Sequence, residues 1–497
     1  MAPFFIIIPL ATAFVMALIA KVDERVQDSL ACVSVACLFA LSVLAVLWLG
    51  PNGPGITVYK VGNWLPPFGI SLVIDGLTVF MLVTVNLVAF CIALFATGYM
   101  KAYTDKWKFY TLFSLMLAGI NGVLVTGDIF NLYVFMEIAA ISAYFLVAFG
   151  TGAEELEASF KYAVMGTIAS CFIFLGIAFL YGYASTLNMA DISMVLSAKG
   201  PAKVVQFVSV LFLMGFGLKS ALVPFHAWLA YAHSSAPAPV SAMLSGVLIK
   251  VLGIYAIARI TFCVFGAASG ISVILIALAV LSMVAGSILA FGQTDIKRLF
   301  AYSTVSQIGY VALGLGIGTP LAILGALFHL FNHSLFKSLL FLNSGSIERM
   351  TGTRDLRRMS GIIEKAPVTG YTSLVAALSI CGVPPLGGFW SKLIIILACV
   401  QAGHPFLAAT AVLVSILTLA YYFKALTPVL FGPAAGIGAV KVRPTFAMNA
   451  AMLILACLVM VSALMLIPQA GTLFMDSAVS ALVKGGTYAT VVFEALK

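Results

Sequence analysis

Apolar stretches of about twenty residues recur from one end of the chain to the other, and short polar segments separate them. A helix needs roughly 20 apolar residues to cross the hydrocarbon core of a bilayer. The pattern therefore predicts an all-α polytopic membrane protein with about 14 transmembrane helices. We expect these helices near residues 3–20, 30–49, 71–98, 108–126, 128–149, 158–184, 205–230, 238–262, 271–290, 299–317, 319–345, 368–402, 406–430 and 447–467.

The seventh and twelfth of these stretches each carry a lysine within seven residues of an interior proline. Lys219 precedes Pro224 by five residues in the seventh stretch, and Lys392 follows Pro385 by seven residues in the twelfth. Proline interrupts the hydrogen bonds of a helix and frees backbone carbonyl groups. A lysine inside a membrane span is costly enough to indicate a function. We therefore expect the seventh and twelfth helices to be broken and to carry an ion site.

The composition is that of a membrane protein without a separate soluble domain. Hydrophobic residues make up 63% of the chain and charged residues 9%, whereas soluble domains average about 25% charged residues. The apolar stretches are too long, and too uniformly apolar, for the alternating strands of a β-barrel. The net charge of +9 lies mostly in short loops, which indicates membrane orientation and not nucleic-acid binding.

The cysteines show no pattern of a metal or redox site. None of the eight forms a C-x-x-C pair, and most lie in apolar stretches. We expect buried small residues, not disulfides, zinc ligands or iron–sulfur ligands. No motif for haem, flavin or a cluster occurs. We therefore expect no cofactor and no metal in this chain, so that any electron chemistry belongs to partner subunits.

Basic residues cluster in the loops that follow odd-numbered helices. The positive-inside rule places such loops in the cytoplasm. Both termini are then expected outside, in the cytoplasmic membrane of a bacterium or archaeon. Lys199 and Lys203, after the sixth helix, go against this assignment. The residues that support it are Lys101, Lys106, Lys108, Lys297, Arg298, Arg349, Arg354, Arg357, Arg358, Lys365, Lys441 and Arg443.

Two halves of the chain share a local pattern. The fifth helix opens with GDIFNLYVFMEIAAISAY and the tenth with QTDIKRLFAYSTVSQIGY. Lys161 and Lys337 follow in the next helices, and the next lysines of the series, Lys219 and Lys392, come after similar intervals. Because five is odd, a unit of five helices is inverted relative to its copy. We therefore expect helices four to eight and nine to thirteen to be inverted repeats. The expected divisions of the chain are 1–107, 108–262, 271–430 and 431–497.

Two residues near helix centres are candidates for ion transfer. Glu137 lies near the middle of the fifth helix, where a lone carboxylate must be protonated or paired. We expect an ion pair with Lys219 that can open and let the lysine pass its proton onward. An interhelical hydrogen bond that only stabilises the bundle is the alternative. Lys250, well inside the eighth helix, could relay a proton towards the second half or extend its stem to an interface.

The eleventh helix carries His329, His333 and Lys337 at intervals of four residues, which places them on one helix face. Histidine titrates near neutral pH and can shuttle protons, so this face is a candidate relay. Two histidines four residues apart could instead bind a metal, but no third ligand is evident nearby and Lys337 would repel a cation. A polar contact surface between helices is the third alternative.

Four further residues are weaker candidates. Asp128 and Lys161 lie near helix ends, where they could simply face water. His226 and His233 follow the proline of the seventh helix. They could connect the lysine of that helix to one membrane surface, or they could face a loop.

Three segments resemble a known family. The segment from Asp128 to Phe149, the run GLKSALVPFHAWLAYAHSSAPAPVSAMLSGVLIK and the element VPPLGGFWSK are similar to antiporter-like subunits. Such subunits occur in respiratory complex I, in Mrp-type sodium/proton antiporters and in membrane-bound energy-converting hydrogenases. The resemblance covers residues 70 to 430, and LGIAFLYGYASTLNMADIS resembles the Mrp D-type subunit in particular.

The resemblance implies the same number of helices, inverted five-helix repeats, and broken seventh and twelfth helices. It implies a Glu–Lys pair, a central lysine, a relay on the eleventh helix and a terminal lysine, which some members replace with glutamate. The corresponding residues here are Glu137, Lys219, Lys250, His329, His333, Lys337 and Lys392.

The sequence therefore predicts a membrane subunit of a multisubunit complex that moves protons, or exchanges sodium for protons, through buried residues. We expect no catalytic chemistry in this chain, which would serve either a redox-driven proton pump or an Mrp-type antiporter. Its expected partners are sister membrane subunits (hydrogenase-like or iron–sulfur subunits in the redox case), the lipid bilayer, and protons or Na⁺, but no nucleic acid. The alternatives are a self-sufficient cation or solute transporter, a non-pumping scaffold subunit of a redox complex, and a subunit of the same fold with another task, as in an inorganic-carbon uptake complex.

Overall fold

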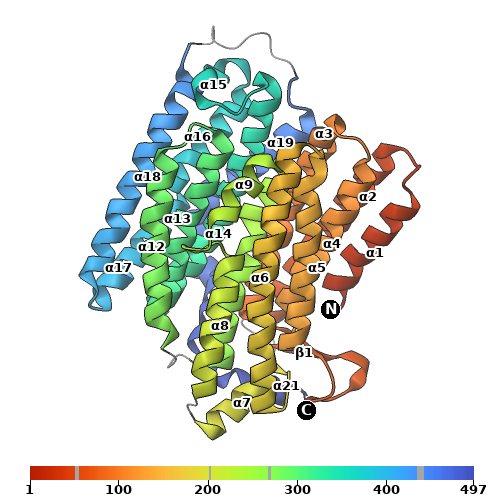
Figure 1. Ribbon diagram of the computed structural model, residues 1–497, viewed down its shortest axis with the longest axis vertical. Helices are drawn as coiled ribbons and strands as arrows, with labels where there is room; N and C mark the ends of the chain where they lie inside the picture. Colours follow the sequence, from red (N-terminus) through yellow and green to blue (C-terminus); the bar gives the residue numbers. More distant parts are fainter. Residues whose placement is uncertain (51–54, 201–202, 267–269, 434–441, 497) are drawn as a thin grey trace.

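The computed structural model describes residues 1–50, 55–200, 203–266, 270–433 and 442–496. Helices account for most of these residues and pack into one elongated bundle (Figure 1). Within the described part of the chain, 11 helices are long and apolar enough to cross a membrane, which is the architecture of an integral membrane protein. Each range in which the apolar pattern predicts a span contains helix.

The N-terminal part combines helices with a small hairpin. Its elements are α1 (Phe4–Leu18), α2 (Glu24–Leu49), β1 (Thr57–Lys60), β2 (Ser71–Ile74), α3 (Gly76–Tyr99) and α4 (Lys106–Val125). The two strands pair antiparallel. The third helix starts at Gly76, later than the apolar pattern predicts, because the residues before it join the hairpin. Asp75 caps this helix by accepting a hydrogen bond from Thr78 N.

The middle of the chain forms a first group of inner helices. Its elements are α5 (Ile129–Val147), α6 (Ala153–Ala184), α7 (Met189–Lys199), α8 (Lys203–Lys219), α9 (Ala227–Ser235), α10 (Ala238–Met243) and α11 (Ala256–Ala258). The last two lie within one helical stretch, Ala238–Val264, which is widened to π-type turns over Leu244–Leu248, Lys250–Tyr255 and Arg259–Val264. The apolar pattern does not predict α7, a short helix at one end of the bundle (Figure 1).

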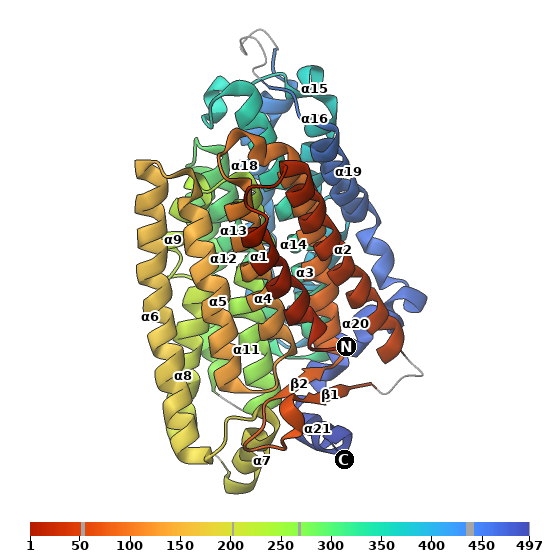
Figure 2. The same ribbon diagram turned by 90° about the vertical axis from the view of Figure 1, so that its right-hand side faces the viewer.

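The remaining helices form a second group and a C-terminal tail. They are α12 (Ile271–Phe291), α13 (Ile296–Ile317), α14 (Pro320–Thr351), α15 (Ile362–Lys365), α16 (Pro367–Cys381), α17 (Gly387–Gln401), α18 (Pro405–Phe431), α19 (Phe446–Val461), α20 (Pro468–Val483) and α21 (Tyr488–Leu496). Short 3₁₀ turns occur at Val61–Asn63, Met100–Ala102, Ala148–Gly150, Leu356–Arg358, Ser462–Leu466 and Gly485–Thr487. Figure 2 shows α6 on one flank of the bundle and α19 on the opposite flank.

Both segments expected to be broken are divided into two helices. Helix α8 ends at Lys219 and α9 begins at Ala227, while α16 ends at Cys381 and α17 begins at Gly387. Prolines lie in both interruptions, where they cannot donate the hydrogen bonds that would continue a helix. Each interruption exposes the carbonyl end of a helix, which carries partial negative charge and favours a nearby ammonium group.

Two loop contacts in the two halves have the same form. Residues 127–129 pair with residues 187–189, and residues 294–296 pair with residues 354–356, each through two backbone hydrogen bonds. The centres of the two pairings have the same separation along the chain (128 to 188 and 295 to 355). Helices α7 and α15, which follow these contacts, lie at opposite ends of the bundle, and both termini lie nearer the α7 end (Figure 1).

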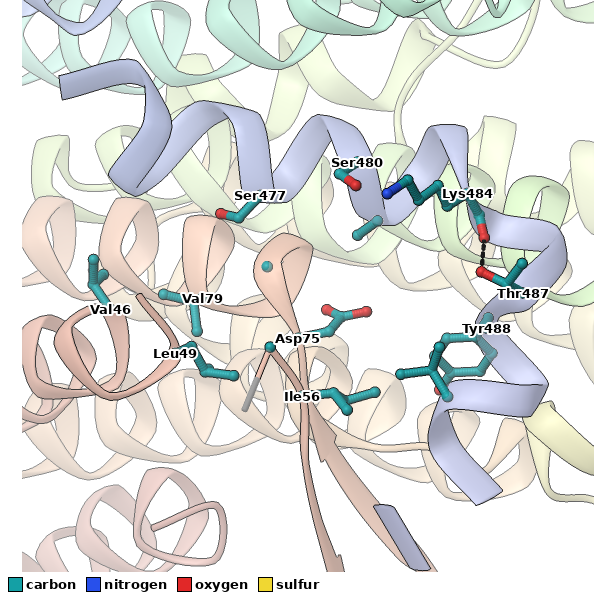
Figure 3. Close-up of a pocket in the computed structure, with 14 residues that line it drawn as sticks. Val46, Leu49, Ile56, Asp75, Val79, Ser477, Ser480, Lys484, Thr487 and Tyr488 are labelled. Atoms are coloured by element: carbon teal, nitrogen blue, oxygen red, sulfur yellow. Dashed lines mark hydrogen bonds between the residues drawn. The ribbon is translucent and has the colours of Figure 1, made fainter. Parts of the chain in front are cut away.

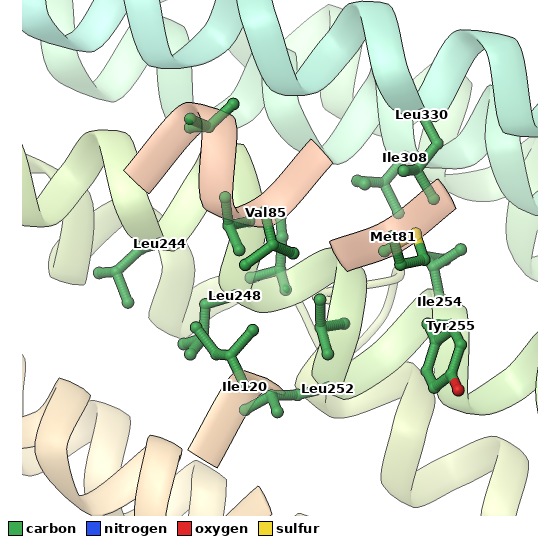
Figure 4. Close-up of a cluster of buried hydrophobic side chains, with 14 of the residues drawn as sticks. Met81, Val85, Ile120, Leu244, Leu248, Leu252, Ile254, Tyr255, Ile308 and Leu330 are labelled. Carbon is green, nitrogen blue, oxygen red and sulfur yellow. The ribbon is translucent and has the colours of Figure 1, made fainter. Parts of the chain in front are cut away.

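The stretch Ala238–Val264 occupies the centre of the bundle. Its most apolar window is 100% buried, whereas the corresponding windows of α2, α18 and α19 are 33% buried and expose the rest to the surroundings. Figure 4 shows its leucines, Leu244, Leu248 and Leu252, beside Val85 of α3 and Ile120 of α4. Polar groups on this stretch are therefore enclosed on every side by other helices.

Candidate functional site

The predicted pair between the fifth and seventh spans is present. Lys219 is the last residue of α8, and its Nζ lies 3.2 Å from Oε1 of Glu137 on α5. Ser170 of α6 donates a hydrogen bond of 2.5 Å to the same carboxylate oxygen. The side chain of Lys219 is 4% exposed and that of Glu137 is 24% exposed. The pair thus joins three helices, and opening it would leave a buried ammonium group without its counter-charge.

Lys250 lies in the central stretch and is fully buried. Its Nζ donates hydrogen bonds of 2.5 and 2.8 Å to the carbonyl oxygens of Ser245 and Gly246. The π-type turns around it change the usual pairing of backbone groups, and such turns are frequent at functional sites. The side chain does not extend to an interface, so of the two expectations for Lys250 the geometry agrees with an interior role.

Lys337 of α14 is held in the same manner as Lys250. Its Nζ donates to the carbonyl oxygen of Phe300 at 2.6 Å and to Oγ of Ser303 at 2.7 Å, both on α13. The hydroxyl group of Tyr422 on α18 lies at 3.4 Å. Among the residues that the structure describes, no carboxylate pairs with either of these lysines, so only the dipoles of neutral groups balance their charge.

The two histidines of α14 lie beside these lysines, and both are fully buried. Their ring centroids are 6.1 Å apart. His329 Nδ1 lies 2.9 Å from Oγ of Ser391 on α17. Both ring nitrogens of His333 and Nε2 of His329 lack a hydrogen-bond partner within the described ranges. Buried polar atoms of this kind are the usual positions of internal water, which can carry protons between side chains.

Lys392 of α17 follows Ser391 and lies at the second interruption. Its Nζ donates a hydrogen bond of 2.7 Å to the carbonyl oxygen of Ile380, near the end of α16. Oγ of Ser415 on α18 lies at 3.5 Å, and the ring of Tyr310 lies 5.3 Å from the ammonium group. The ammonium group of Lys392 thus lies at the carbonyl end of α16, whereas Lys219 is itself the last residue of α8 and its ammonium group binds Glu137.

The four weaker candidates differ in position. Asp128 caps α5 by accepting a hydrogen bond from Asn131 N. Lys161 is 39% exposed and pairs with Glu157 on the outer face of α6, so it does not occupy a buried position like that of Lys337. His226 is half-buried at the start of α9.

His233 is fully buried and stacks on Phe341 of α14, with 4.7 Å between ring centroids. Neither of its ring nitrogens has a partner in the described part of the chain. It lies near Lys250, Lys297 and Lys337, close enough for electrostatic interaction with each. Of the four weaker candidates, it therefore has the surroundings that best suit a relay.

Sequence reasoning missed the buried ion pairs at the two ends of the bundle. Arg259 forms a bidentate salt bridge with Asp75, with Nη1 2.5 Å from Oδ2 and Nη2 2.8 Å from Oδ1. It donates a third hydrogen bond to the hydroxyl group of Thr78. At the other end Lys106 pairs with Asp28 at 2.9 Å. An arginine inside an apolar run was a visible signal for the first pair, but its partner lies 184 residues away in the chain.

A network of charges also closes the α15 end of the bundle. Lys297 pairs with Glu348 at 2.7 Å, and Arg354 lies between Glu154 at 3.0 Å and Asp295 at 3.4 Å. In the adjacent loop a hydrogen bond from Arg357 lowers the pKa of Asp355 to about 2. In the described residues no group of three or more His, Cys, Asp or Glu side chains could hold a metal ion.

Family models and related proteins all place the chain in the same family. Residues 126–418 match the family described as the transmembrane region of NADH:quinone oxidoreductase and Mrp antiporters. Residues 64–110 match the N-terminus of chain 5 of the complex I NADH-ubiquinone oxidoreductase. The N-type subunit of the NADH-quinone oxidoreductase of Desulforudis audaxviator is 41% identical over 371 residues, which is 74% of each chain. The D-type subunit of the Na⁺/H⁺ antiporter of Alkalihalophilus pseudofirmus is 36% identical over 415 residues, which is 83% of each chain.

Solved structures show the same similarity over nearly the full length. A chain of the Mrp complex from Dietzia sp. superposes with a TM-score of 0.90 at 29% identity and covers 99% of both chains. A chain of the membrane-bound sulfane sulfur reductase, an archaeal respiratory membrane complex, gives a TM-score of 0.91 at 31% identity with the same coverage. The chain therefore belongs to the family of antiporter-like membrane subunits shared by NADH:quinone oxidoreductases and Mrp antiporters.

Proposed function

We propose that this chain is a proton-translocating membrane subunit of a multisubunit complex. Its relatives are named as subunits of Na⁺/H⁺ antiporters and of an NADH-quinone oxidoreductase. The observation that carries the proposal is a series of enclosed basic side chains across the middle of the bundle. The series comprises Lys219, Lys250, Lys337, His333, His329 and Lys392. Burying an ionisable group costs free energy, so a bundle that served only as a scaffold would gain nothing from this series.

The proposed path begins at the pair between Glu137 and Lys219. Ser220, the residue after Lys219, packs closely against Gly253 of the central stretch, less than one turn after Lys250. Opening and closing of the pair would therefore change both the charge and the packing beside Lys250. This coupling supports the transfer of a proton, or of the effect of its charge, from the first half to the centre.

The second half of the path runs from Lys250 to Lys392. Lys250 lies close enough to His333 and Lys337 to influence both electrostatically, and Lys392 lies similarly close to His329. In the proposed sequence, a charge on one group disfavours a charge on the next, so that protonation passes along the series. We further propose that His233 connects this series to the α15 end, where the buried Lys297 pairs with the partly exposed Glu348.

We also propose that the chain has about 14 crossings and inverted repeats, with divisions at 1–107, 108–262, 271–430 and 431–497. The matching loop contacts, which have the same spacing along the chain and lie at opposite ends of the bundle, support the inversion. The arginine-rich loop beside α15 supports a cytoplasmic position for that end and an outside position for both termini, in a bacterial or archaeal membrane.

We propose an Mrp-type Na⁺/H⁺ antiporter as the parent complex. The D-type antiporter relative aligns over 83% of both chains, which supports this assignment. A redox-driven pump is the second candidate, because the 41% identical relative and the archaeal reductase chain belong to respiratory complexes. In either case the chain works beside sister membrane subunits, and any iron–sulfur or hydrogenase-like partner, rather than this chain, carries the redox cofactors.

The function is tested with the complex purified through a tag on this chain and reconstituted in liposomes that contain a pH-sensitive dye. The proposal predicts proton movement when a Na⁺ gradient is imposed, and no requirement for an electron donor. Proton movement that requires an electron donor and an electron acceptor would assign the chain to the redox-driven class. No proton movement under either driving force, with all subunits present, would contradict the proposed function.

A further inference from the structure

A pocket of about 390 Å³ lies at the end of the bundle where the chain terminates. Helices α2 and α3 form one wall, and α20 and α21 form the other (Figure 3). Aliphatic side chains, including Val46, Leu49 and Val79, line one side. Ser477, Ser480 and Lys484 line the opposite side. The pocket is separate from the lysine series and combines an apolar surface with a polar rim.

The charges in this pocket favour a ligand that carries one negative charge and a hydrogen-bond donor. Asp75 and Lys484 are its charged lining residues among those that the structure describes. Asp75 is nearly fully buried, and Arg259 balances its charge. The ammonium group of Lys484 therefore gives the pocket a net positive charge.

The carboxylate of Asp75 retains capacity for a further hydrogen bond. Its Oδ1 accepts from Arg259 Nη2 and from Thr78 N, whereas Oδ2 accepts from Arg259 Nη1. A carboxylate oxygen has two acceptor positions. Because Asp75 lines the pocket, the remaining position on Oδ2 is available to a donor bound there.

An exposed tryptophan beside the pocket indicates its depth in the membrane. Trp48, which precedes the lining residue Leu49 near the end of α2, is 61% exposed. Tryptophan concentrates at the interface between the lipid headgroups and the hydrocarbon. Next to Trp48, the exposed side chains of Leu44 and Leu47 form an apolar surface on the outer face of α2. A headgroup in the pocket would therefore have its acyl chains beside that face.

We propose that this pocket binds one phospholipid whose headgroup combines a phosphate with a hydrogen-bond donor, as in phosphatidylethanolamine or phosphatidylglycerol. The phosphate faces Lys484 and Ser480, the amine or hydroxyl donor faces Asp75, and the acyl chains follow α2. The lipid thus links the C-terminal helices to the pair of Asp75 and Arg259, and Arg259 lies on the same central stretch as Lys250. Phosphatidylcholine lacks a donor in its headgroup and is the natural comparison.

The test is native mass spectrometry of the purified complex, delipidated and titrated with each of the three lipids. Phosphatidylethanolamine and phosphatidylglycerol should be retained on this chain more strongly than phosphatidylcholine. Lys484→Ala should weaken the retention of both about tenfold, because one charge-assisted contact is lost, and Lys484→Arg should restore it. Lys203→Ala, which removes another exposed lysine at the same end, serves as the control and should have no effect.

Equal retention of all three lipids, or an unchanged affinity in Lys484→Ala, would overturn the proposal. A photoreactive amino acid at Ser480 gives an independent result on what occupies the pocket. Crosslinking to phospholipid in native membranes is expected. Crosslinking to a sister subunit instead would assign the pocket to a protein contact and overturn the lipid site.

Discussion

Lys250 and Lys337 are stabilised by oxygen atoms of neutral groups, whereas Lys219 has a carboxylate partner. Dipoles compensate a buried ammonium group less completely than a full opposite charge does. The charge state of Lys250 and Lys337 therefore depends strongly on nearby charges, and each can respond when the other, or Lys219, changes. This sensitivity suits the proposed relay, in which the pair of Glu137 and Lys219 is the switch.

Replacement of the carboxylate tests that switch. Glu137→Gln keeps the size of the side chain and an acceptor for Ser170, but it leaves Lys219 buried without its counter-charge. A broken buried pair costs roughly 3–5 kcal/mol, and the partial exposure of Glu137 places the loss of stability at the lower end. Proton transport by the assembled complex should fall at least about tenfold, measured with a fluorescent pH probe in vesicles.

The matched control for this variant lies on the surface of α6. Glu157 pairs with Lys161 at 2.6 Å, and both side chains are exposed. Glu157→Gln should change transport and thermal stability very little, because exposed ion pairs contribute less than about 1 kcal/mol. Equal losses in the two variants would show that the buried pair has no special role.

At the scale of the elements, the central stretch determines how the two halves meet. Its π-type turns and its glycines allow close approach of neighbouring segments. A methyl group added at Gly253 would lie 2.7 Å from Cα of Ser220, immediately after Lys219. The break after α8 thus fits against the helix that carries Lys250, and this contact links the surroundings of Lys219 and Lys250.

Gly253→Ala tests this contact. The added methyl group must push the segment after Lys219 away, and overpacking of this kind costs about 1–3 kcal/mol. We expect a lower thermal midpoint of the complex and slower proton transport. Gly182→Ala on α6, where nothing lies within 4 Å of the added group, should preserve both. Unchanged transport in a stable Gly253→Ala complex would contradict the proposed coupling through this contact.

The element scale also shows what the sequence could and could not predict. Lys219 and Lys392 beside prolines predicted the two broken helices, because a buried lysine and an interior proline in one stretch together indicate a site. Proline alone is a weaker signal, since Pro9 and Pro428 lie inside the unbroken helices α1 and α18. The spacing of His329, His333 and Lys337 predicted one shared helix face, because residues four apart lie above one another on a helix. The π-type turns around Lys250 were beyond prediction, because the packing of surrounding helices determines them and not a local residue preference.

Long-range pairs set a second limit on prediction from sequence. Arg259 was visible as a charge in an apolar stretch, but nothing local identifies Asp75, 184 residues earlier, as its partner. Lys161 was matched to Lys337 by position in the repeat, yet only Lys337 is buried. Helix α7 was missed because it is too short to give a membrane-length apolar signal.

At the scale of the whole molecule, an arginine-rich loop marks the end near α15. This loop carries Arg354, Arg357 and Arg358, whereas both termini lie nearer the α7 end, where Lys199 and Lys203 are also found (Figure 1). Under the positive-inside rule, this loop supports the proposed orientation with the termini outside. The proposed inverted repeat would place the two broken helices in opposite orientations across the membrane, which fits a pathway that is open to both sides in turn.

Single-cysteine labelling tests this orientation. In a background where the exposed native cysteines are replaced by serine, a cysteine at Arg357 should react with a membrane-impermeant maleimide only in inside-out vesicles. A cysteine at Lys484 should react only in intact cells whose outer barriers have been removed. Labelling of both positions from the same side would contradict the proposed arrangement of the ends.

The proposed path as a whole depends most on Lys250, which connects its two halves. Lys250→Met keeps a long side chain but cannot carry a proton, and it removes a buried charge, so the complex should assemble normally. The decisive measurement is proton transport by this variant in reconstituted vesicles, with assembly checked by native gel and with Lys161→Met as the surface control. We expect loss of transport in Lys250→Met and wild-type transport in the control. Wild-type transport by a fully assembled Lys250→Met complex would contradict the relay.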